Sequence, residues 1–342
     1  MLHELNNLPQ GILQLEAHEL TTALAGPSLI HLPGRRPEPL FVSVLMHGNE
    51  TVGWDAVRHL LARYEGGKSL PRAMSLFIGN IAAAAEGLRR LPGQPDYNRV
   101  WPGSEEADSE ESRMMAQIVE IMRPRHPFAS IDVHNNTGFN PHYACVNRLD
   151  TTFLHLALLF GRTVVYFLRP KGVQSMAFAE LCPAVTLECG KVGQAYGATH
   201  ADQFLDACLH LSLHPQHPVS AQDIDLFHTV ARVTVLPDVT IGFVAGQGEI
   251  IFESDLDRMN FQELPAGTPL GRINGSAPVD LLDVRDERGR EVASDYFTFK
   301  EGLLCLRRPV MPSMLTKDTN VIRQDCLCYL MERYGAHLKD AK

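Results

Sequence analysis

Residues 47–50, His-Gly-Asn-Glu, place an imidazole and a carboxylate three positions apart at the end of an apolar run. The preceding residues, 39–46, have the composition of a buried strand, and Thr51 offers a helix start immediately afterwards. A histidine that leaves a strand and a glutamate that enters a helix can point at one ion across a tight corner. Taken alone the pattern is weak evidence for a metal site. His47 could equally cap the helix, and Glu50 could be an acid that the positive N-terminal end of the helix dipole stabilises.

Two further side chains of the same kind lie where apolar runs end, namely His134 and Glu188. Side chains that converge on one ligand in an α/β sheet come from the carboxyl ends of its strands. Catalytic zinc takes three protein ligands and leaves one position open, and two histidines with one glutamate are a familiar set. We therefore predict that His47, Glu50 and His134 hold one Zn²⁺ per chain. Asp132 would face the same side as His134 and could orient it.

The elements that must position these residues alternate along the first two hundred positions. Short apolar runs bounded by Pro, Gly or Asn predict strands at 39–46, 73–79, 128–134, 163–168 and 184–189. Helix-like segments lie between or after them at 51–64, 112–123, 151–161 and 198–214. This alternation predicts an α/β fold, with a sheet covered by helices on both sides.

The character of the chain changes after about residue 215. A stretch punctuated by Pro, His and Ser reads as a linker, and short β-like runs follow at 231–236, 249–254, 279–284 and 302–308. We predict a catalytic domain over residues 1–215 and a smaller β-rich domain over 216–342. The terminal segment 322–334, IRQDCLCYLMERY, is expected to return as a helix.

Composition narrows the function classes. The chain has 342 residues, 45% hydrophobic and 21% charged, with a formal net charge of -9, so a nucleic-acid partner is not expected. No run approaches the ~20 apolar residues of a membrane span, and the N-terminus does not resemble a signal peptide. Seven cysteines without a framework spacing predict reduced thiols in a cytoplasmic protein.

Five motifs in order carry a family resemblance: HGNE (47–50), GNIAAAAEGLR (79–89), DYNRVWPG (96–103), DVHNNTG (132–138) and TLECG (186–190). Together they resemble the succinylglutamate desuccinylase and aspartoacylase family, which shares its catalytic architecture with zinc carboxypeptidases. The resemblance covers roughly residues 40–190, with a weaker likeness at 260–268. It implies a zinc-carboxypeptidase-like mixed central sheet flanked by helices, with a smaller β-rich C-terminal domain, and the same three zinc ligands.

The resemblance also implies roles for four other residues. Glu188 would take the proton of a metal-activated water and later pass it to the leaving nitrogen. Asn98 and Arg99 would hold a substrate carboxylate, which suits the planar fork of an arginine. Arg89 would polarise the scissile carbonyl. Each has a structural alternative: the Asn-Arg pair could brace its loop, Glu188 could be an ordinary strand-end acid, and Arg89 could be a solvated surface charge.

The favoured function is a zinc-dependent amidohydrolase, a deacylase that releases an amino acid or similar amine from a small N-acyl compound bearing a carboxylate. A zinc carboxypeptidase acting on short peptides or cell-wall fragments is the alternative, and a non-catalytic metabolite-binding protein is a third interpretation. The acyl group, the amine and the oligomeric state stay open, a homo-oligomer included. So do the roles of Tyr296, His142 and Tyr143, whereas Cys189 is expected to be inert packing.

Overall fold

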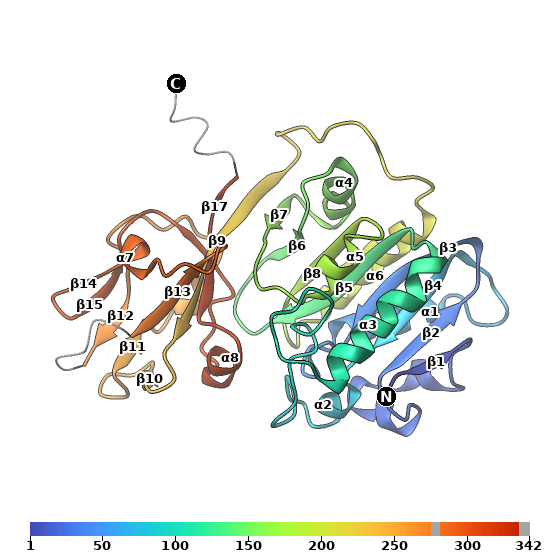
Figure 1. The fold of residues 1–342 in the computed structure, drawn as a ribbon, viewed down its shortest axis with the longest axis horizontal. Helices are drawn as coiled ribbons and strands as arrows, with labels where there is room; N and C mark the ends of the chain where they lie inside the picture. The colour runs from blue at the N-terminus through green and yellow to red at the C-terminus, as the bar shows by residue number, and fades with distance from the viewer. Residues whose placement is uncertain (275–280, 335–342) are drawn as a thin grey trace. The chain divides into compact units, whose positions relative to one another are not determined.

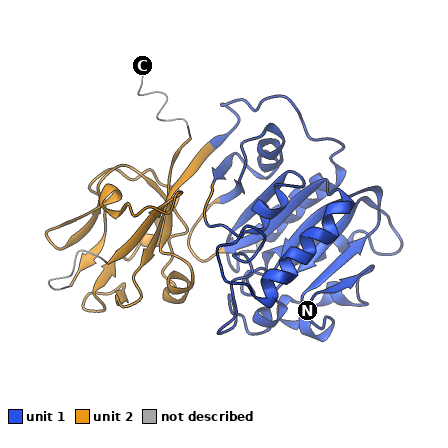
Figure 2. Cartoon of the chain, viewed as in Figure 1, with its two compact units in different colours: residues 1–135, 142–166, 170–225 blue, residues 136–141, 167–169, 226–342 orange. Residues whose placement is uncertain are grey.

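The computed structural model describes residues 1–274 and 281–334. It contains two compact units, coloured separately in Figure 2. Unit 1 comprises residues 1–135, 142–166 and 170–225, and unit 2 comprises 136–141, 167–169 and 226–342. The domain boundary between residues 215 and 216 stays a prediction, because compactness does not show which part folds by itself.

Unit 1 is built on a mixed sheet with helices on its faces (Figure 1). In sheet order its strands are β1 (His3–Leu5), β2 (Ser28–Leu32), β4 (Leu70–Ile78), β3 (Gly34–Val44), β5 (Ala129–Asn136), β8 (Ala184–Lys191), β6 (His142–Val146) and β7 (Thr163–Tyr166). Strand β3 runs parallel to β4 and β5, whereas β2 opposes β4 and β6 opposes β8. The last six residues of β3 are all buried, as expected of a strand covered on both faces.

The helices of unit 1 are α1 (Val52–Ala62), α2 (Ile81–Ala85), α3 (Glu110–Met122), α4 (Thr151–Phe160), α5 (Gln174–Phe178) and α6 (Ala195–His210). Short 3-10 helices lie at Ile12–Gln14, Ala17–Thr22 and Arg123–Arg125. Helix α3 crosses the front of the sheet in Figure 1. The predicted strands and long helices are therefore found with small shifts at their ends, whereas β1, β2, β6, α2 and α5 were not predicted.

A cluster of aromatic side chains packs against the sheet. Phe41 of β3 stacks on Phe178 of α5 with ring centroids 4.1 Å apart, and Trp101 meets Phe77 and Phe178 edge-on at 6.0 Å. All four rings are fully buried. Burying a large apolar side chain contributes about 1.5–3 kcal/mol, so this layer anchors α5 and the 98–104 loop to the sheet.

Unit 2 is β-rich. Strand β9 (Asp225–Val235) pairs antiparallel with β13 (Leu282–Asp286) and β17 (Cys328–Arg333), and β17 pairs with β16 (Met311–Ser313). A second sheet has the order β10 (Ile241–Gly242), β11 (Ile250–Phe252), β12 (Pro269–Ile273), β15 (Leu303–Leu306) and β14 (Phe297–Lys300). Short helices accompany the sheets in the described part of unit 2, namely η4 (Leu256–Arg258), α7 (Ala293–Tyr296) and α8 (Thr319–Gln324). Of the predicted run 279–284, residues 279 and 280 lie outside the described residues.

These features confirm the α/β fold class, with a mixed central sheet flanked by helices and a smaller β-rich part. The predicted terminal helix over 322–334 is wrong for most of its length. Helix α8 covers only 322–324 of it, and residues 328–333 form β17, which has backbone partners on both sides. An apolar run of this length suits a buried strand as well as a helix, and the two neighbouring strands decide the outcome.

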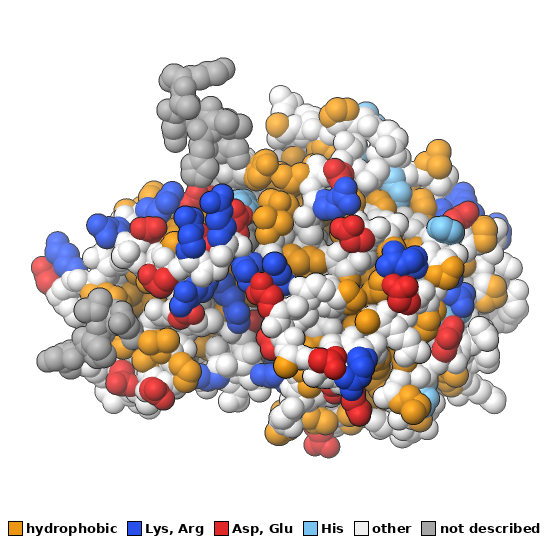
Figure 3. Space-filling model, in the orientation of Figure 1, with side chains coloured by type: hydrophobic (Ala, Val, Ile, Leu, Met, Phe, Trp, Pro, Cys, Tyr) orange, Lys and Arg blue, Asp and Glu red, His pale blue; other side chains and the backbone are white. Residues whose placement is uncertain are grey.

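Two features of the structure bear on membrane and macromolecular partners. Among the described residues, every helix is too short or too polar to cross a bilayer. On the face shown in Figure 3, basic and acidic side chains are interspersed on both units.

Candidate metal centre and catalytic site

The corner that carries His47 and Glu50 is shaped by its backbone. Strand β3 ends at Val44, and Leu45 follows with a φ of 56°, in the left-handed region that non-glycine residues rarely adopt. Gly48 packs directly on α2, because a β-carbon there would lie 2.3 Å from the backbone of Ala83 and Ala84. The left-handed backbone of Leu45 is tolerated where the surrounding structure fixes the conformation. The chain leaves the sheet at this residue, and the 47–50 segment follows.

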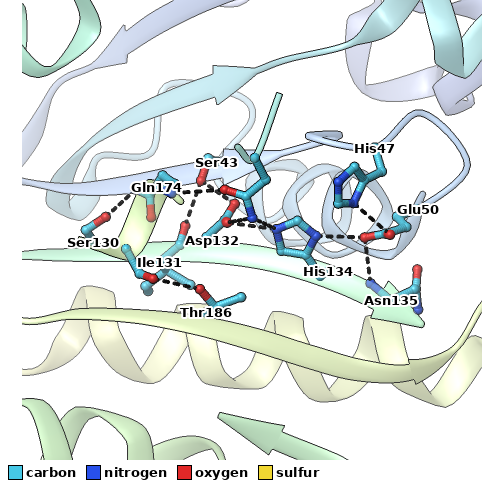
Figure 4. A network of polar contacts seen from close by, with 12 residues as sticks. Ser43, His47, Glu50, Ser130, Ile131, Asp132, His134, Asn135, Gln174 and Thr186 are labelled. Atoms are coloured by element: carbon cyan, nitrogen blue, oxygen red, sulfur yellow. Dashed lines mark hydrogen bonds and ion pairs between the residues drawn. The ribbon is translucent and has the colours of Figure 1, made fainter. Parts of the chain in front are cut away.

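The Glu50 carboxylate lies between two imidazoles (Figure 4). Its Oε1 is 2.8 Å from Nδ1 of His47, and its Oε2 is 2.7 Å from Nδ1 of His134. All three side chains are buried, and one ligand atom from each lies within 4.8 Å of the others. The structure therefore brings together the three residues that the sequence predicts as metal ligands.

The outer nitrogen of each imidazole meets a second carboxylate. Nε2 of His47 lies 2.9 Å from Oδ1 of Asp96, and Nε2 of His134 lies 2.7 Å from Oδ2 of Asp132. Asp132 also accepts a hydrogen bond of 2.7 Å from the hydroxyl of Ser43 on β3. Carboxylates in these places fix the ring orientation of a metal-binding histidine and raise its basicity. The predicted position of Asp132 is confirmed, whereas Asp96 was not predicted.

Helix α1 is tied to this group through its first turn. Thr51 makes no capping hydrogen bond with its side chain, and the Val52 amide donates instead to Oδ1 of Asn135 at 3.2 Å. The backbone amide of Asn135 in turn donates to Oε2 of Glu50 at 3.3 Å. A donor at the helix start that would otherwise lack a partner is thus satisfied by the strand that carries His134.

Electrostatic coupling inside this buried group is strong. Burial would raise the pKa of Glu50, but the two imidazoles outweigh it and hold that pKa far below its ordinary value. Burial would lower the pKa of His134, but Asp132 and Glu50 raise it well above its ordinary value. The pKa of Asp96 is likewise held well below its usual range, against burial, by His47 and two arginines. The site thus keeps carboxylates ionised in a water-poor environment.

The donor set fits a zinc ion by its chemistry. Zinc accepts imidazole nitrogen and carboxylate oxygen as ligands, and it uses three protein ligands where it takes part in catalysis. His47, Glu50 and His134 supply those donors from two strand ends and a helix start. Asp96 and Asp132 supply the outer contacts that metal-binding histidines require.

Arg89 lies beside the ligand group. One guanidinium nitrogen is 2.9 Å from Oδ2 of Asp96, and the other is 3.4 Å from Oε1 of Glu50. Its backbone carbonyl accepts a 3.0 Å hydrogen bond from the Gly48 amide. Its neighbour Arg90 turns away and bonds the carbonyl of Gln94 at 3.0 Å. The position predicted for a catalytic arginine is therefore inside the site.

Asn98 and Arg99 occupy different environments. The side chain of Asn98 is buried, and its Nδ2 donates to Oδ2 of Asp132 at 3.0 Å. Its Oδ1 accepts a 2.9 Å hydrogen bond from the backbone amide of Gln174. Arg99 is half-buried, and its guanidinium donates to the backbone carbonyl of Asn98 at 2.8 Å. The structure thus gives Asn98 a bracing place beside the Asp132–His134 pair and leaves Arg99 as the more accessible of the two.

Glu188 lies near the end of β8, next to β5 in the sheet. Side chains alternate along a strand, so Glu188 shares a face with Thr186, whose hydroxyl donates to Ser175 of α5 at 3.0 Å. Helix α5 also bonds Ser130, on the face of β5 that carries His134. Glu188 therefore lies on the same side of the sheet as the ligand group, and its side chain is buried.

Three residues left open by the sequence also receive places. Tyr143 lies directly opposite Glu188 across the β6–β8 ladder and is buried, and His142 lies opposite Cys189. The ring of His142 stacks on Phe160 and Tyr196. Burial and the nearby Glu188 and Glu50 raise the pKa of the Cys189 thiol well above its ordinary value, which agrees with inert packing. Tyr296 belongs to the buried core of unit 2.

Sequence reasoning missed Asp96, Asn135 and Gln174. Asp96 is part of the DYNR motif that carried the family resemblance, so a signal was present for it. Asn135 directly follows the predicted ligand His134, but its link to α1 depends on long-range packing. Gln174 lies in a five-residue helix that no local pattern marked.

Comparisons with known proteins agree with the fold and with the family resemblance. A family model described as the succinylglutamate desuccinylase/aspartoacylase catalytic domain matches residues 39–214. A search of curated proteins gave no match. Among solved structures, succinylglutamate desuccinylase from Vibrio cholerae matches with a TM-score of 0.62 at 12% identity, covering 95% of this chain and 96% of that one. Murine aminoacylase 3 matches at 0.56 and 14% identity, covering 87% and 96%.

A further match is the product-bound ectoine utilization protein EutE (DoeB) from Ruegeria pomeroyi, at a TM-score of 0.50 and 17% identity, covering 83% and 82%. At these identities the structural matches establish the fold, whereas the family model spans more than half of the chain. The chain belongs to the succinylglutamate desuccinylase/aspartoacylase family.

Proposed function

We propose that the chain is a zinc-dependent amidohydrolase that cleaves the amide bond of an N-acyl amino acid or a similar small substrate bearing a carboxylate. The observation that carries the proposal is the buried His47–Glu50–His134 group, with donor atoms within 4.8 Å, in a chain of a deacylase family. The names of the matched relatives, desuccinylases and an aminoacylase, point to the same reaction class.

His47, Glu50 and His134 would hold the zinc, with Asp96 and Asp132 fixing the two imidazole rings. Bound zinc lowers the pKa of a coordinated water from 15.7 to about 7 and polarises a carbonyl, which is the chemistry that amide hydrolysis at neutral pH requires. The remaining steps fall to the side chains around the metal site.

Glu188 would accept the proton of the attacking water and deliver it to the leaving nitrogen, as a carboxylate that is not itself a ligand can do. Arg89 would stabilise the negative charge that develops on the carbonyl oxygen, a contribution of about 3 kcal/mol for one donor. Its ion pairs with Asp96 and Glu50 support this role by fixing the guanidinium beside the ligands. Arg99 would receive the substrate carboxylate, with Asn98 bracing it from its buried place.

The deciding experiment is a screen of the zinc-loaded protein against N-acetyl and N-succinyl amino acids and against dipeptides, with detection of free amine. We expect turnover of at least one N-acyl amino acid, and none by the His134→Ala variant. Turnover of dipeptides alone would favour the carboxypeptidase alternative. A protein that binds no zinc and hydrolyses neither class would favour a non-catalytic role.

A cytoplasmic location remains part of the proposal. Its support is chemical: all seven cysteines are buried free thiols, as expected in a reducing compartment.

A further inference from the structure

The loop before α5 presses against the backbone of the proposed carboxylate-binding arginine. Gly172 has a φ of +72°, and a β-carbon there would lie 2.1 Å from the carbonyl oxygen of Arg99 and 2.9 Å from the side chain of Ser104. Real β-carbons do not approach backbone this closely. The two loops can therefore meet only because residue 172 has no side chain.

Hydrogen bonds on both sides of this contact hold the same two segments together. The backbone amide of Trp101 donates to the Gly172 carbonyl at 3.0 Å, and the backbone amide of Gln174 donates to Oδ1 of Asn98 at 2.9 Å. The Ser104 hydroxyl donates to the Arg99 carbonyl at 2.6 Å. The Arg99 carbonyl thus packs against Gly172 and accepts a hydrogen bond from Ser104. Asn98 and Trp101, on either side of Arg99, are hydrogen-bonded to the loop before α5.

We propose that Gly172 is a positioning residue for substrate recognition: its missing side chain sets the place of the Arg99 backbone, and with it the guanidinium that receives the substrate carboxylate. The inference rests on the proposed function of Arg99. It goes beyond that function by assigning carboxylate specificity to the packing of residue 172, which has no side chain of its own to offer the substrate.

The chain offers a matched control for Gly172→Ala. Gly66 lies in the turn after α1, outside both of these loops, with a φ of +75°, and a β-carbon there would meet nothing within 4 Å. Both alanine substitutions carry the strain of a left-handed backbone. Only Gly172→Ala also forces the Arg99 carbonyl to move, so the difference between the two variants isolates the contact.

The measurement compares the best N-acyl amino acid substrate with its methyl ester, prepared so that every carboxylate of the substrate is esterified. For Gly172→Ala we expect KM for the acid to rise about tenfold or more, the usual worth of a charge-assisted bond, with kcat and the ester nearly unchanged. Zinc content should stay at the parent value, and Gly66→Ala should match the parent for both substrates. An unchanged KM for the acid, an equal loss for acid and ester, or an equal loss in Gly66→Ala would overturn the inference.

Two further arms keep the test independent. If Gly172→Ala does not fold, Ser104→Ala removes the other contact to the Arg99 carbonyl without a clash. It should raise KM for the acid alone, and an unchanged KM would count against the inference. If the parent hydrolyses no N-acyl amino acid, the proposed function fails, and calorimetric titration with succinate tests the inference instead. Weaker succinate binding by Gly172→Ala than by Gly66→Ala supports it, whereas equal affinities, or no binding by the parent, overturn it.

Discussion

The carboxylate of Asp96 lies 2.9 Å from Nε2 of His47, on the nitrogen opposite the one that faces Glu50. The contact joins residues 49 positions apart in the sequence. It fixes the imidazole so that Nδ1 points into the ligand group. The same arrangement recurs at His134 with Asp132, so both candidate histidine ligands are oriented from behind by a buried acid.

Replacing Asp96 with asparagine should weaken zinc binding while leaving the three ligands in place. Loss of such an outer contact typically costs about 10–100-fold in metal affinity, and we expect a change of that size in competition titrations with a chelator. Asp223→Asn, at an exposed position, is the matched control and should bind zinc like the parent. Parent-like affinity in Asp96→Asn would show that the His47 ring is oriented by other contacts.

Glu188→Gln should keep the fold and one zinc per chain but lose most of its turnover. An amide of the same shape cannot accept the proton of the attacking water, and this kind of catalysis contributes about 10²–10⁴-fold. Steady-state kinetics and metal analysis on the same sample separate the two effects. Glu180→Gln, an exposed acid nearby in sequence, should be silent. Turnover at the parent rate in Glu188→Gln would exclude Glu188 as the base.

Arg89 and Arg90 form a natural test pair. Arg89 reaches Asp96 and Glu50, whereas Arg90 bonds only a backbone carbonyl among the contacts resolved for it. Arg89→Ala should lower kcat about 10²–10³-fold, the usual effect of removing one donor to a developing oxyanion. Arg90→Ala should stay near the parent kcat. Similar losses in both variants would mean that Arg89 acts through stability, which thermal unfolding of the two proteins would reveal.

The cysteines should be chemically silent in the native protein. All seven thiols are buried. Burial raises the pKa of five of them, Cys145, Cys182, Cys189, Cys208 and Cys328. In these five cysteines the reactive thiolate therefore forms at a higher pH than in a free thiol. Ellman's reagent at pH 8 should find no fast-reacting thiol before denaturation and seven afterwards. A single fast thiol at Cys189 would reopen a nucleophilic role for that residue.

The sequence predicted that His47, Glu50 and His134 lie together, because these residues fall at places that a local pattern marks. His47, Glu50 and His134 lie where apolar runs stop, and the carboxyl ends of neighbouring strands meet in an α/β sheet. The contact of Asp96 with His47 could not be predicted in the same way, since it spans a loop whose course depends on packing. The close packing of Gly48 on α2 likewise depends on an element further along the chain.

The error at residues 322–334 has a similar cause. The apolar run around Cys328 suits a helix or a buried strand, and only the presence of β9 and β16 on its two sides decides between them. Local composition describes what an element can become. Its neighbours, which come from distant parts of the chain, determine what it is.

The most direct test is the position and amount of zinc in the purified protein. Metal analysis should give one zinc per chain for the parent and a large loss for His134→Ala. Anomalous diffraction at the zinc edge should place a single ion between Nδ1 of His47, Nδ1 of His134 and the Glu50 carboxylate. A zinc-supplied protein with no ion there, or with its zinc bound elsewhere, would contradict the account.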